Sequence, residues 1–441
     1  MRVRVLDVMS EIRASYWFVP GVMGIAGLAA AVVLLWVDSI YGQWVKDLPW
    51  VYSGDPAAAR SLLSTLSGSI ITVAGVLFSI TIVVLSLTSN QYGSWVLLNF
   101  LRDRALQMSF GVFIGTFIYC VAVLSSFGPG DSGTPSTPRL SVTVAIAAAI
   151  FSFAILIFFI HHVASDIQAD RILASIGKEL LESMEGSRPE KTGRDGQPAP
   201  PPLDGGRTIT SRVDGYIHGV DSDELMRLAT RHDLLIGVEV QPGQFALVGS
   251  PLAVVVPPDR LDDGLVGKIT QAFLMGPHQS PAQDTTFAVR QLIEAAMRAL
   301  SPSLNDSYTA IASIDRLLPA LCKLVVEEPP SRCRCDRQGK VRLILNPVTF
   351  VQMLDMSISP IRRSVRTDVL ASIRLLEALG ELATRAHRPE DLAAIASHAR
   401  SLLSGAQEVL SDGPDLQKIR QRYQGVLEAS RQPPPQRQKD A

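Results

Sequence analysis

Four long apolar segments near the start of the chain constrain its fold more than any other feature of the sequence. None of the four contains Asp, Glu, Lys or Arg. About 20 mainly apolar residues in a helix cross a bilayer core, and a helix satisfies its own backbone hydrogen bonds in lipid. The sequence therefore predicts a four-helix transmembrane domain over residues 1–161, with spans at residues 17–37, 62–87, 106–127 and 140–160.

Basic residues near the ends of these spans indicate the orientation of the domain. Cytoplasmic loops of membrane proteins carry an excess of Lys and Arg. Seven basic residues flank the side that holds both chain ends, and three flank the opposite side. This difference predicts a multi-pass protein of the inner (cytoplasmic) membrane with both termini in the cytoplasm. The seven are Arg2, Arg4, Arg13, Arg102, Arg104, Arg171 and Lys178, and the three are Lys46, Arg60 and Arg139.

The second span carries a row of small and hydroxylic residues. Steps of three and four residues keep the row on one side of a helix, and Ile82 is its one interruption. Two interpretations stay open. Gly, Ser and Thr allow helix backbones to approach closely in lipid, while several copies of such a face around an axis line a pore. The row consists of Ser61, Thr65, Gly68, Thr72, Gly75, Ser79, Ser86 and Ser89.

The rest of the chain is more polar and predicts an α+β cytosolic region after the membrane α-helical domain. Its pattern indicates strands at residues 208–218 and 234–240, a helix at about residues 222–231 between them, and a helix at residues 303–325. The predicted segments are an amphipathic helix and flexible linker at 162–206, a small α+β module at 207–260, a mainly helical domain at 261–430 and a disordered tail at 431–441.

A polar cluster close together in sequence is the candidate ligand site of the soluble half. Carboxylates, guanidinium groups and an amide in one short stretch are able to bind a small ligand or a partner protein. The alternative is that they only cap helices and form ion pairs. The cluster consists of Asp284, Arg290, Arg298, Asn305 and Asp306.

Two further groups are weighed as metal ligands. His161 and His162 end the fourth span, and Asp166 and Asp170 follow at helical spacing, which suits a metal site, a pH sensor or an ordinary solvated helix end. Cys322, Cys333 and Cys335 provide three thiols, whereas a tetrahedral zinc site needs four ligands. The sequence therefore predicts neither a metal nor a cofactor.

Composition and motifs argue against two broad classes of function. The formal net charge of −1 provides no electrostatic basis for nucleic-acid binding. The chain has no phosphate-binding loop, no His-Glu-x-x-His helix and no nucleophile elbow. We therefore expect a protein that is not an enzyme and that binds no nucleic acid.

Three stretches resemble a known bacterial family. They are ITVAGVLFSITIVVLSLTSNQYG at residues 71–93, Gln283-Asp284 followed by Phe287, Arg290, Gln291 and Leu292, and RALSPSLNDSYTA at residues 298–310. Together they resemble the predicted membrane proteins grouped as domain of unknown function number twenty-two fifty-four. The resemblance covers most of the chain and implies the same bacterial membrane architecture, without implying an activity.

Two functional hypotheses follow from these observations. The first is a homo-oligomeric channel or passive transport protein, in which the second span lines the path and the cytosolic region gates it. The second is a membrane-anchored regulatory or scaffold protein whose cytosolic region binds a ligand or partner. The expected partners are the lipid bilayer, other copies of the chain, and a small ligand or protein on the cytosolic side.

Overall fold

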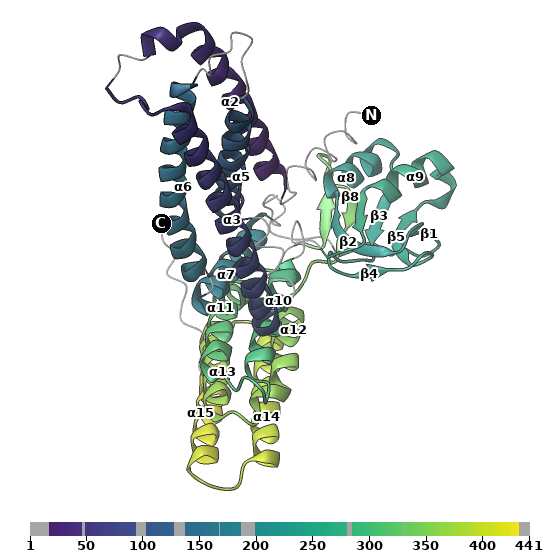
Figure 1. Ribbon diagram of the computed structural model, residues 1–441. Helices are drawn as coiled ribbons and strands as arrows, with labels where there is room; N and C mark the ends of the chain where they lie inside the picture. Colours follow the sequence, from purple (N-terminus) through teal and green to yellow (C-terminus); the bar gives the residue numbers. More distant parts are fainter. Residues whose placement is uncertain are drawn as a thin grey trace, which may run out of the picture. The chain divides into compact units, whose positions relative to one another are not determined.

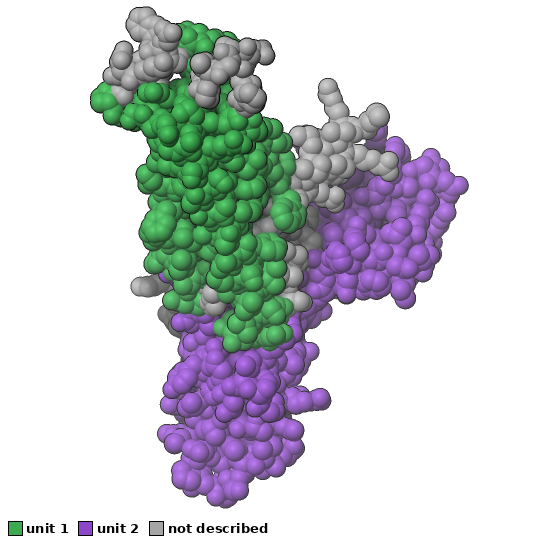
Figure 2. Space-filling model, in the orientation of Figure 1, with its two compact units in different colours: residues 1–168 green, residues 169–441 purple. Residues whose placement is uncertain are grey.

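The computed structural model contains two compact units, which divide between Gln168 and Ala169 (Figure 2). The predicted site residue Asp284, part of the predicted linker and almost all of the predicted tail lie outside the described residues. The structure describes residues 17–45, 49–93, 103–127, 137–166, 168–186, 199–279, 285–329 and 331–431.

Within its described residues, the first unit contains four helices that are long and apolar enough to cross a membrane, as the sequence predicts. Asp55 and Asp103 cap the N-termini of the second and third, accepting hydrogen bonds from the amides of Ala58 and Ala105. The four are α2 (Phe18–Val45), α3 (Pro56–Tyr92), α5 (Arg104–Ser125) and α6 (Arg139–Asp166), labelled in Figure 1.

Helix α5 is the central helix of this unit. It packs against α2, α3 and α6. In its most apolar segment 50% of the residues are buried, whereas 28% or less are buried in the corresponding segments of the other three helices. A Cβ at Gly27 of α2 would lie 2.3 Å from the carbonyl oxygen of Gly115 on α5. A Cβ at Gly115 would lie 2.9 Å from the carbonyl oxygen of Met23. Glycine is therefore needed here for the two backbones to meet.

Asp38 of α2 caps the start of α6 across the bundle. Its carboxylate accepts hydrogen bonds from the amides of Leu140 at 3.0 Å and Ser141 at 2.8 Å, and from the Ser141 hydroxyl at 2.7 Å. The first amides of a helix have no partner within the helix. Asp38 therefore satisfies donors that would otherwise be unpaired at the end of a membrane helix.

Replacing Asp38 with alanine is expected to lower the free energy of unfolding of the membrane unit by about 2 kcal/mol. The substitution removes the acceptor for two amides and one hydroxyl. Titration with a denaturing detergent, followed by helicity, measures the effect. Asp38→Asn keeps one acceptor oxygen and should lose about half as much. An alanine variant as stable as the wild type would contradict the capping role.

The second unit contains a helical part and an α/β part. In the helical part, α7 packs against α10 and α11, and α13 packs against α11 and α15. Its helices are α7 (Ala169–Gly186), α10 (Thr285–Ala299), α11 (Ser307–Val326), α12 (Phe350–Val365), α13 (Val369–Arg385), α14 (Pro389–Val409) and α15 (Pro414–Arg431).

The predicted helix at residues 303–325 is wrong at its start. Helix α11 begins at Ser307, because Asn305 has a positive φ of 49° and Asp306 is the N-cap. The Asp306 carboxylate accepts a hydrogen bond from the Thr309 amide at 3.0 Å. The left-handed backbone at Asn305 is incompatible with a continuing helix, so Asp306 starts the helix instead.

The α/β part, which we call the α/β module, contains two sheets and the helices α8 and α9 in the part of the chain that the structure describes (Figure 1). The larger sheet has the order β1-β5-β3-β8-β7, and the smaller has the order β4-β2-β6. The elements are β1 (Arg207–Thr210), β2 (Gly215–Val220), α8 (Ser222–Arg231), β3 (Leu235–Val238), β4 (Phe245–Ala246), β5 (Pro251–Val256), α9 (Asp263–Gln271), β6 (Phe273–Gly276), β7 (Cys333–Cys335) and β8 (Val341–Ile344).

The structure replaces the single strand predicted at residues 208–218 with two strands in different sheets. β1 pairs with β5, whereas β2 pairs with β4 and β6. The break lies at Ser211, whose hydroxyl donates to the carbonyl of Val213 at 2.6 Å and accepts from its amide at 3.3 Å. This local loop redirects the chain from one sheet to the other.

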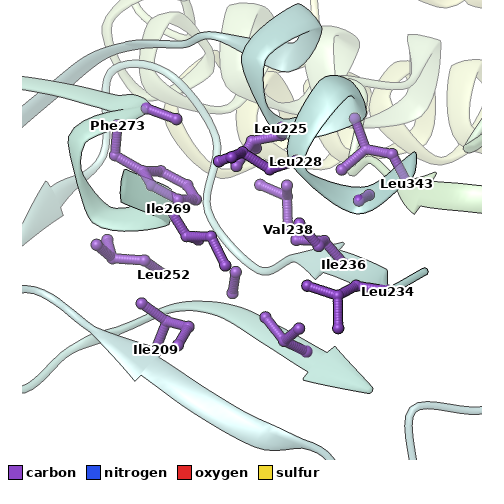
Figure 3. Packing of buried hydrophobic residues seen from close by; sticks show 14 of the residues in the cluster. Ile209, Leu225, Leu228, Leu234, Ile236, Val238, Leu252, Ile269, Phe273 and Leu343 are labelled. Carbon is purple, nitrogen blue, oxygen red and sulfur yellow. The ribbon is translucent and has the colours of Figure 1, made fainter. Parts of the chain in front are cut away.

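The core of the α/β module joins distant parts of the chain (Figure 3). Leu225 and Leu228 of α8 point toward Ile236 and Val238 of β3. Leu343 of β8 belongs to the same core and is fully buried. Because β8 runs parallel to β3, pairing Ile236 with Leu343, residues 333–344 complete a sheet that residues 207–256 begin.

A cluster of charges at the edge of this module surrounds Asp233. Its carboxylate accepts hydrogen bonds from Lys340 and Arg260, each at 2.6 Å, and from Arg342. These bonds, with that from Lys340 the strongest influence, hold the pKa of Asp233 far below its usual range. Arg342 also donates to Asp336 at 2.7 Å and lowers the pKa of that carboxyl. The cluster ties the turn before β3 to β8.

The charge cluster around Asp233 predicts that the stability of the α/β module falls in acid. Because the pKa of Asp233 is lower in the folded than in the unfolded state, its contribution is complete above about pH 4 and is lost as the pH falls toward the folded-state value. When the pH is lowered from about 5 to about 2, hydrogen-exchange protection in β3 should therefore fall less in Asp233→Asn than in the wild type. The same change at exposed Asp259 is the control. Equal acid sensitivity of wild type and Asp233→Asn would exclude this role.

Candidate functional site

Helix α3 has a face that packs against the rest of its unit. Its buried residues recur every three or four positions, so they lie on one side of the helix. Several of them belong to apolar clusters shared with α5 and α6. They are Ala59, Leu63, Ser67, Ile70, Ala74, Leu77, Thr81, Leu85, Thr88 and Tyr92.

The row of small and hydroxylic residues lies on the other side of α3. Ser79 follows the buried Leu77 by two residues, a rotation of about 200° around the helix axis. All eight residues of the row are exposed except Ser89, which is partly buried. A Cβ added at Gly68 or Gly75 would meet nothing within 4 Å. The row therefore does not pack inside its own four-helix unit.

The two threonine hydroxyls of this row donate hydrogen bonds within the helix. Thr65 donates to the carbonyl of Ser61 at 2.9 Å, and Thr72 donates to the carbonyl of Gly68 at 2.7 Å. Each hydroxyl proton is thus used within the helix, while the oxygen keeps acceptor capacity toward the outside. The row presents neutral oxygen acceptors and bare backbone, with no charged group among its members.

The row is long enough to cross a bilayer. The 28 steps from Ser61 to Ser89 correspond to about 42 Å of helix, compared with a hydrocarbon core of about 30 Å. Helix α3 itself has 37 residues and extends beyond the core. The row is therefore long enough to reach from one side of a membrane to the other, with an interruption at Ile82.

The outward faces of α2 and α6 differ from this row. They carry large apolar side chains, which suit contact with lipid tails. Such residues, including Phe78 and Val83, also flank the row on α3. The exposed large apolar residues on α2 and α6 include Val22, Ile25, Leu28, Val32, Trp36, Ile150, Phe151, Phe153, Ile157 and Ile160. The row is thus a distinct strip among lipid-compatible surfaces.

The glycines that hold the membrane unit together were not predicted from the sequence. Gly111 and Gly115, four residues apart on α5, approach Met23 and Gly27 of α2. The signal was present, because this spacing is the small-xxx-small pattern of close helix packing. The unit therefore has two small-residue faces, one used between α2 and α5 and one turned outward on α3.

Three of the four described members of the predicted polar cluster have a side-chain contact close in sequence. Arg290 donates to Thr286 at 3.2 Å, Arg298 pairs with Glu294 at 2.8 Å, and Asp306 caps α11. These are the contacts expected of helix caps and exposed ion pairs. A ligand-binding role for Arg290, Arg298, Asn305 and Asp306 stays a prediction.

The C-terminal end of α6 contacts the start of α5 through His162 and Asp103. The Nε2 atom of His162 lies 2.7 Å from Oδ2 of Asp103, and the His162 ring stacks on Phe158 with ring centroids 5.6 Å apart.

Burial raises the pKa of the Cys322 and Cys333 thiols. Within the described parts of the chain, His, Cys, Asp and Glu side chains form no group of three or more able to hold a metal ion.

The comparisons with known proteins agree with this architecture. A family model described as "Predicted membrane protein (DUF2254)" matches residues 13–381. The chain belongs to this family. Two relatives titled "Uncharacterized protein", from Mycobacterium bovis and Mycobacterium tuberculosis strain H37Rv, are each 29% identical over 418 residues, covering 92% of this chain and 79% of the relative. No solved structure matches the chain. The resemblance seen at residues 71–93 and 298–310 is thus confirmed.

Proposed function

We propose that this membrane protein is a homo-oligomeric channel or passive transport protein in which several copies of α3 surround a shared path. The observation that carries the proposal is the outward, full-length row from Ser61 to Ser89 on α3. One four-helix unit does not enclose this row, so a path along it needs further copies of the chain. The proposal rests on a face that is uncharged, continuous and separate from the packing face.

The chemistry of the row suits a weakly selective path. Neutral hydroxyl oxygens replace part of the hydration shell of a solute without trapping it as a carboxylate would. The glycines at positions 68 and 75 leave space beside the helix and expose backbone. Lipid tails make few contacts with such a strip, whereas water and small polar solutes meet hydrogen-bond acceptors along its length.

We assign the second unit to the cytoplasm as the gating region, with both termini on that side of the inner membrane. The seven basic residues on the side of the chain ends, against three opposite, support this orientation. Ligand or partner binding by this unit would then regulate the path.

Mass measurement and flux measurement together test the proposal. The full chain in nanodiscs should have the mass of an oligomer, and the chain in planar bilayers should carry a current. A strict monomer, or an oligomer without measurable flux of ions or small polar solutes, would leave the alternative of a membrane-anchored regulatory or scaffold protein.

Ile82 gives a prediction specific to this path. It is the large apolar residue that interrupts the row, and it is 51% exposed on the same side of α3. An apolar constriction limits conduction by excluding water. Ile82→Ser should therefore raise the flux by about tenfold. Ile80→Ser, which changes an exposed isoleucine away from the row, is the control, and equal flux in both variants would contradict a constriction at Ile82.

A further inference from the structure

Three aliphatic side chains lie exposed on two neighbouring loops of the α/β module. Val213, between β1 and β2, and Leu247 and Val248, in the turn after β4, are 55%, 59% and 62% exposed. A cluster of this kind marks a surface that contacts another apolar phase, because each side chain gains free energy when it leaves water. We call these three residues the apolar tip.

Hydrogen bonds join the two loops of the apolar tip into one piece. The amide of Gly249 donates to the carbonyl of Ser211, and the amide of Ser211 donates to the carbonyl of Ser250, both at 2.9 Å. The amide of Val248 donates to the Asp214 carboxylate at 2.7 Å. The tip is therefore preorganised, which reduces the entropy lost when it docks.

All four backbone amides of the turn at residues 247–250 already have acceptors. The Leu247 amide donates to the Ser250 hydroxyl at 3.0 Å, and the Ser250 amide donates to the Leu247 carbonyl at 2.9 Å. Those of Val248 and Gly249 bond to Asp214 and Ser211. A turn that enters an apolar medium must leave no donor unpaired. The apolar tip meets this requirement.

The charged residues beside the tip suit a phospholipid surface. Arg212, next to Val213, is exposed, while the carboxylate of neighbouring Asp214 accepts the hydrogen bond from Val248. A guanidinium beside aliphatic side chains binds a headgroup phosphate while the aliphatic groups enter the upper acyl region. The membrane helices of the same chain also raise the effective concentration of lipid around the module.

We propose that the apolar tip docks on the phospholipid surface of the membrane. Val213, Leu247 and Val248 then lie among the upper acyl chains, and Arg212 lies at the level of the phosphates. This contact would restrain the α/β module at the bilayer whether or not the protein conducts. It is independent of the role proposed for α3.

Spin labelling of the full chain in phospholipid vesicles tests the contact. A nitroxide is attached at Val248→Cys, and at exposed Gln271→Cys of α9 as the control, in a chain with Cys322→Ala and Cys335→Ala. We expect the ratio of collision rates with oxygen and with a water-soluble nickel complex to be about tenfold higher at 248 than at 271. Equal ratios overturn the proposal, because the tip then lies in water. Low collision rates with both reagents, with spin–spin broadening, overturn it in favour of contact with a second copy.

A second variant separates docking from general apolarity. With the label moved to Val213→Cys, the double change Leu247→Asp and Val248→Asp should lower the collision-rate ratio to that of the control site. Leu274→Asp, at an exposed leucine of β6, should leave the ratio unchanged. Equal losses in the two variants would show that the tip has no special role. All of these side chains are exposed, so the fold tolerates the changes.

Discussion

Ser79→Leu is expected to lower flux through the reconstituted protein by at least about tenfold, while each subunit keeps its fold. The leucine places four carbons in the middle of the outward row, at a position that does not contact the rest of its own unit. In the proposed assembly that volume enters the shared path from every subunit at once. Flux into vesicles, normalised to the amount of folded protein, measures the loss.

The matched control for this prediction is Ser69→Leu. Ser69 is also exposed on α3, but it lies about 80° around the helix from Ser79, at the edge of the row and not at its centre. The chemical change is the same, so lipid partitioning and helix propensity change equally. If Ser69→Leu and Ser79→Leu reduce flux to the same extent, the row is not the path and α3 contributes only general packing.

Gly115→Leu is expected to destabilise the membrane unit by about 3 kcal/mol or more, which prevents accumulation of folded protein. Even the Cβ of a new side chain would lie 2.9 Å from the carbonyl oxygen of Met23. Backbone cannot move aside as a flexible side chain can, so α2 and α5 must separate. Detergent-induced unfolding, or the yield of folded protein where the variant does not accumulate, measures the effect.

Gly75→Leu is the control for this second prediction. It makes the same change in a membrane helix, but a Cβ at Gly75 meets nothing within 4 Å. The stability of the single subunit should therefore change by less than about 1 kcal/mol, although flux should fall as for Ser79→Leu. Similar destabilisation by Gly75→Leu and Gly115→Leu would contradict the distinction between an inner and an outer small-residue face.

The sequence predicted the row of small and hydroxylic residues on α3, but it predicted only in part which neighbours that row faces. Steps of three and four residues place Ser61 to Ser89 on one side of a helix whatever surrounds it. They do not indicate which neighbour that side meets, because Gly, Ser and Thr serve close packing and pore lining equally well. The same ambiguity hid the packing role of Gly27 and Gly115.

In the second unit, local signals were reliable where a short stretch determines its own structure. The helix predicted at residues 222–231 is α8 (Ser222–Arg231), and Asp306 caps α11 as its position suggests. The predicted strand at residues 208–218 is two strands, because Ser211 and Val213 bond to each other and redirect the chain. A loop that depends on one side-chain hydroxyl leaves little trace in periodicity.

The sequence alone determined that the described part of this chain has four helices long and apolar enough to cross a membrane and a mixed helical and sheet region after them. That information is local, since an uncharged run long enough to cross a bilayer has few other stable structures. Tertiary structure alone decided that Gly27 meets Gly115, that β8 pairs with β3, and that the row on α3 faces outward. Those outcomes depend on contacts between residues far apart in the chain, whose energies no single segment contains.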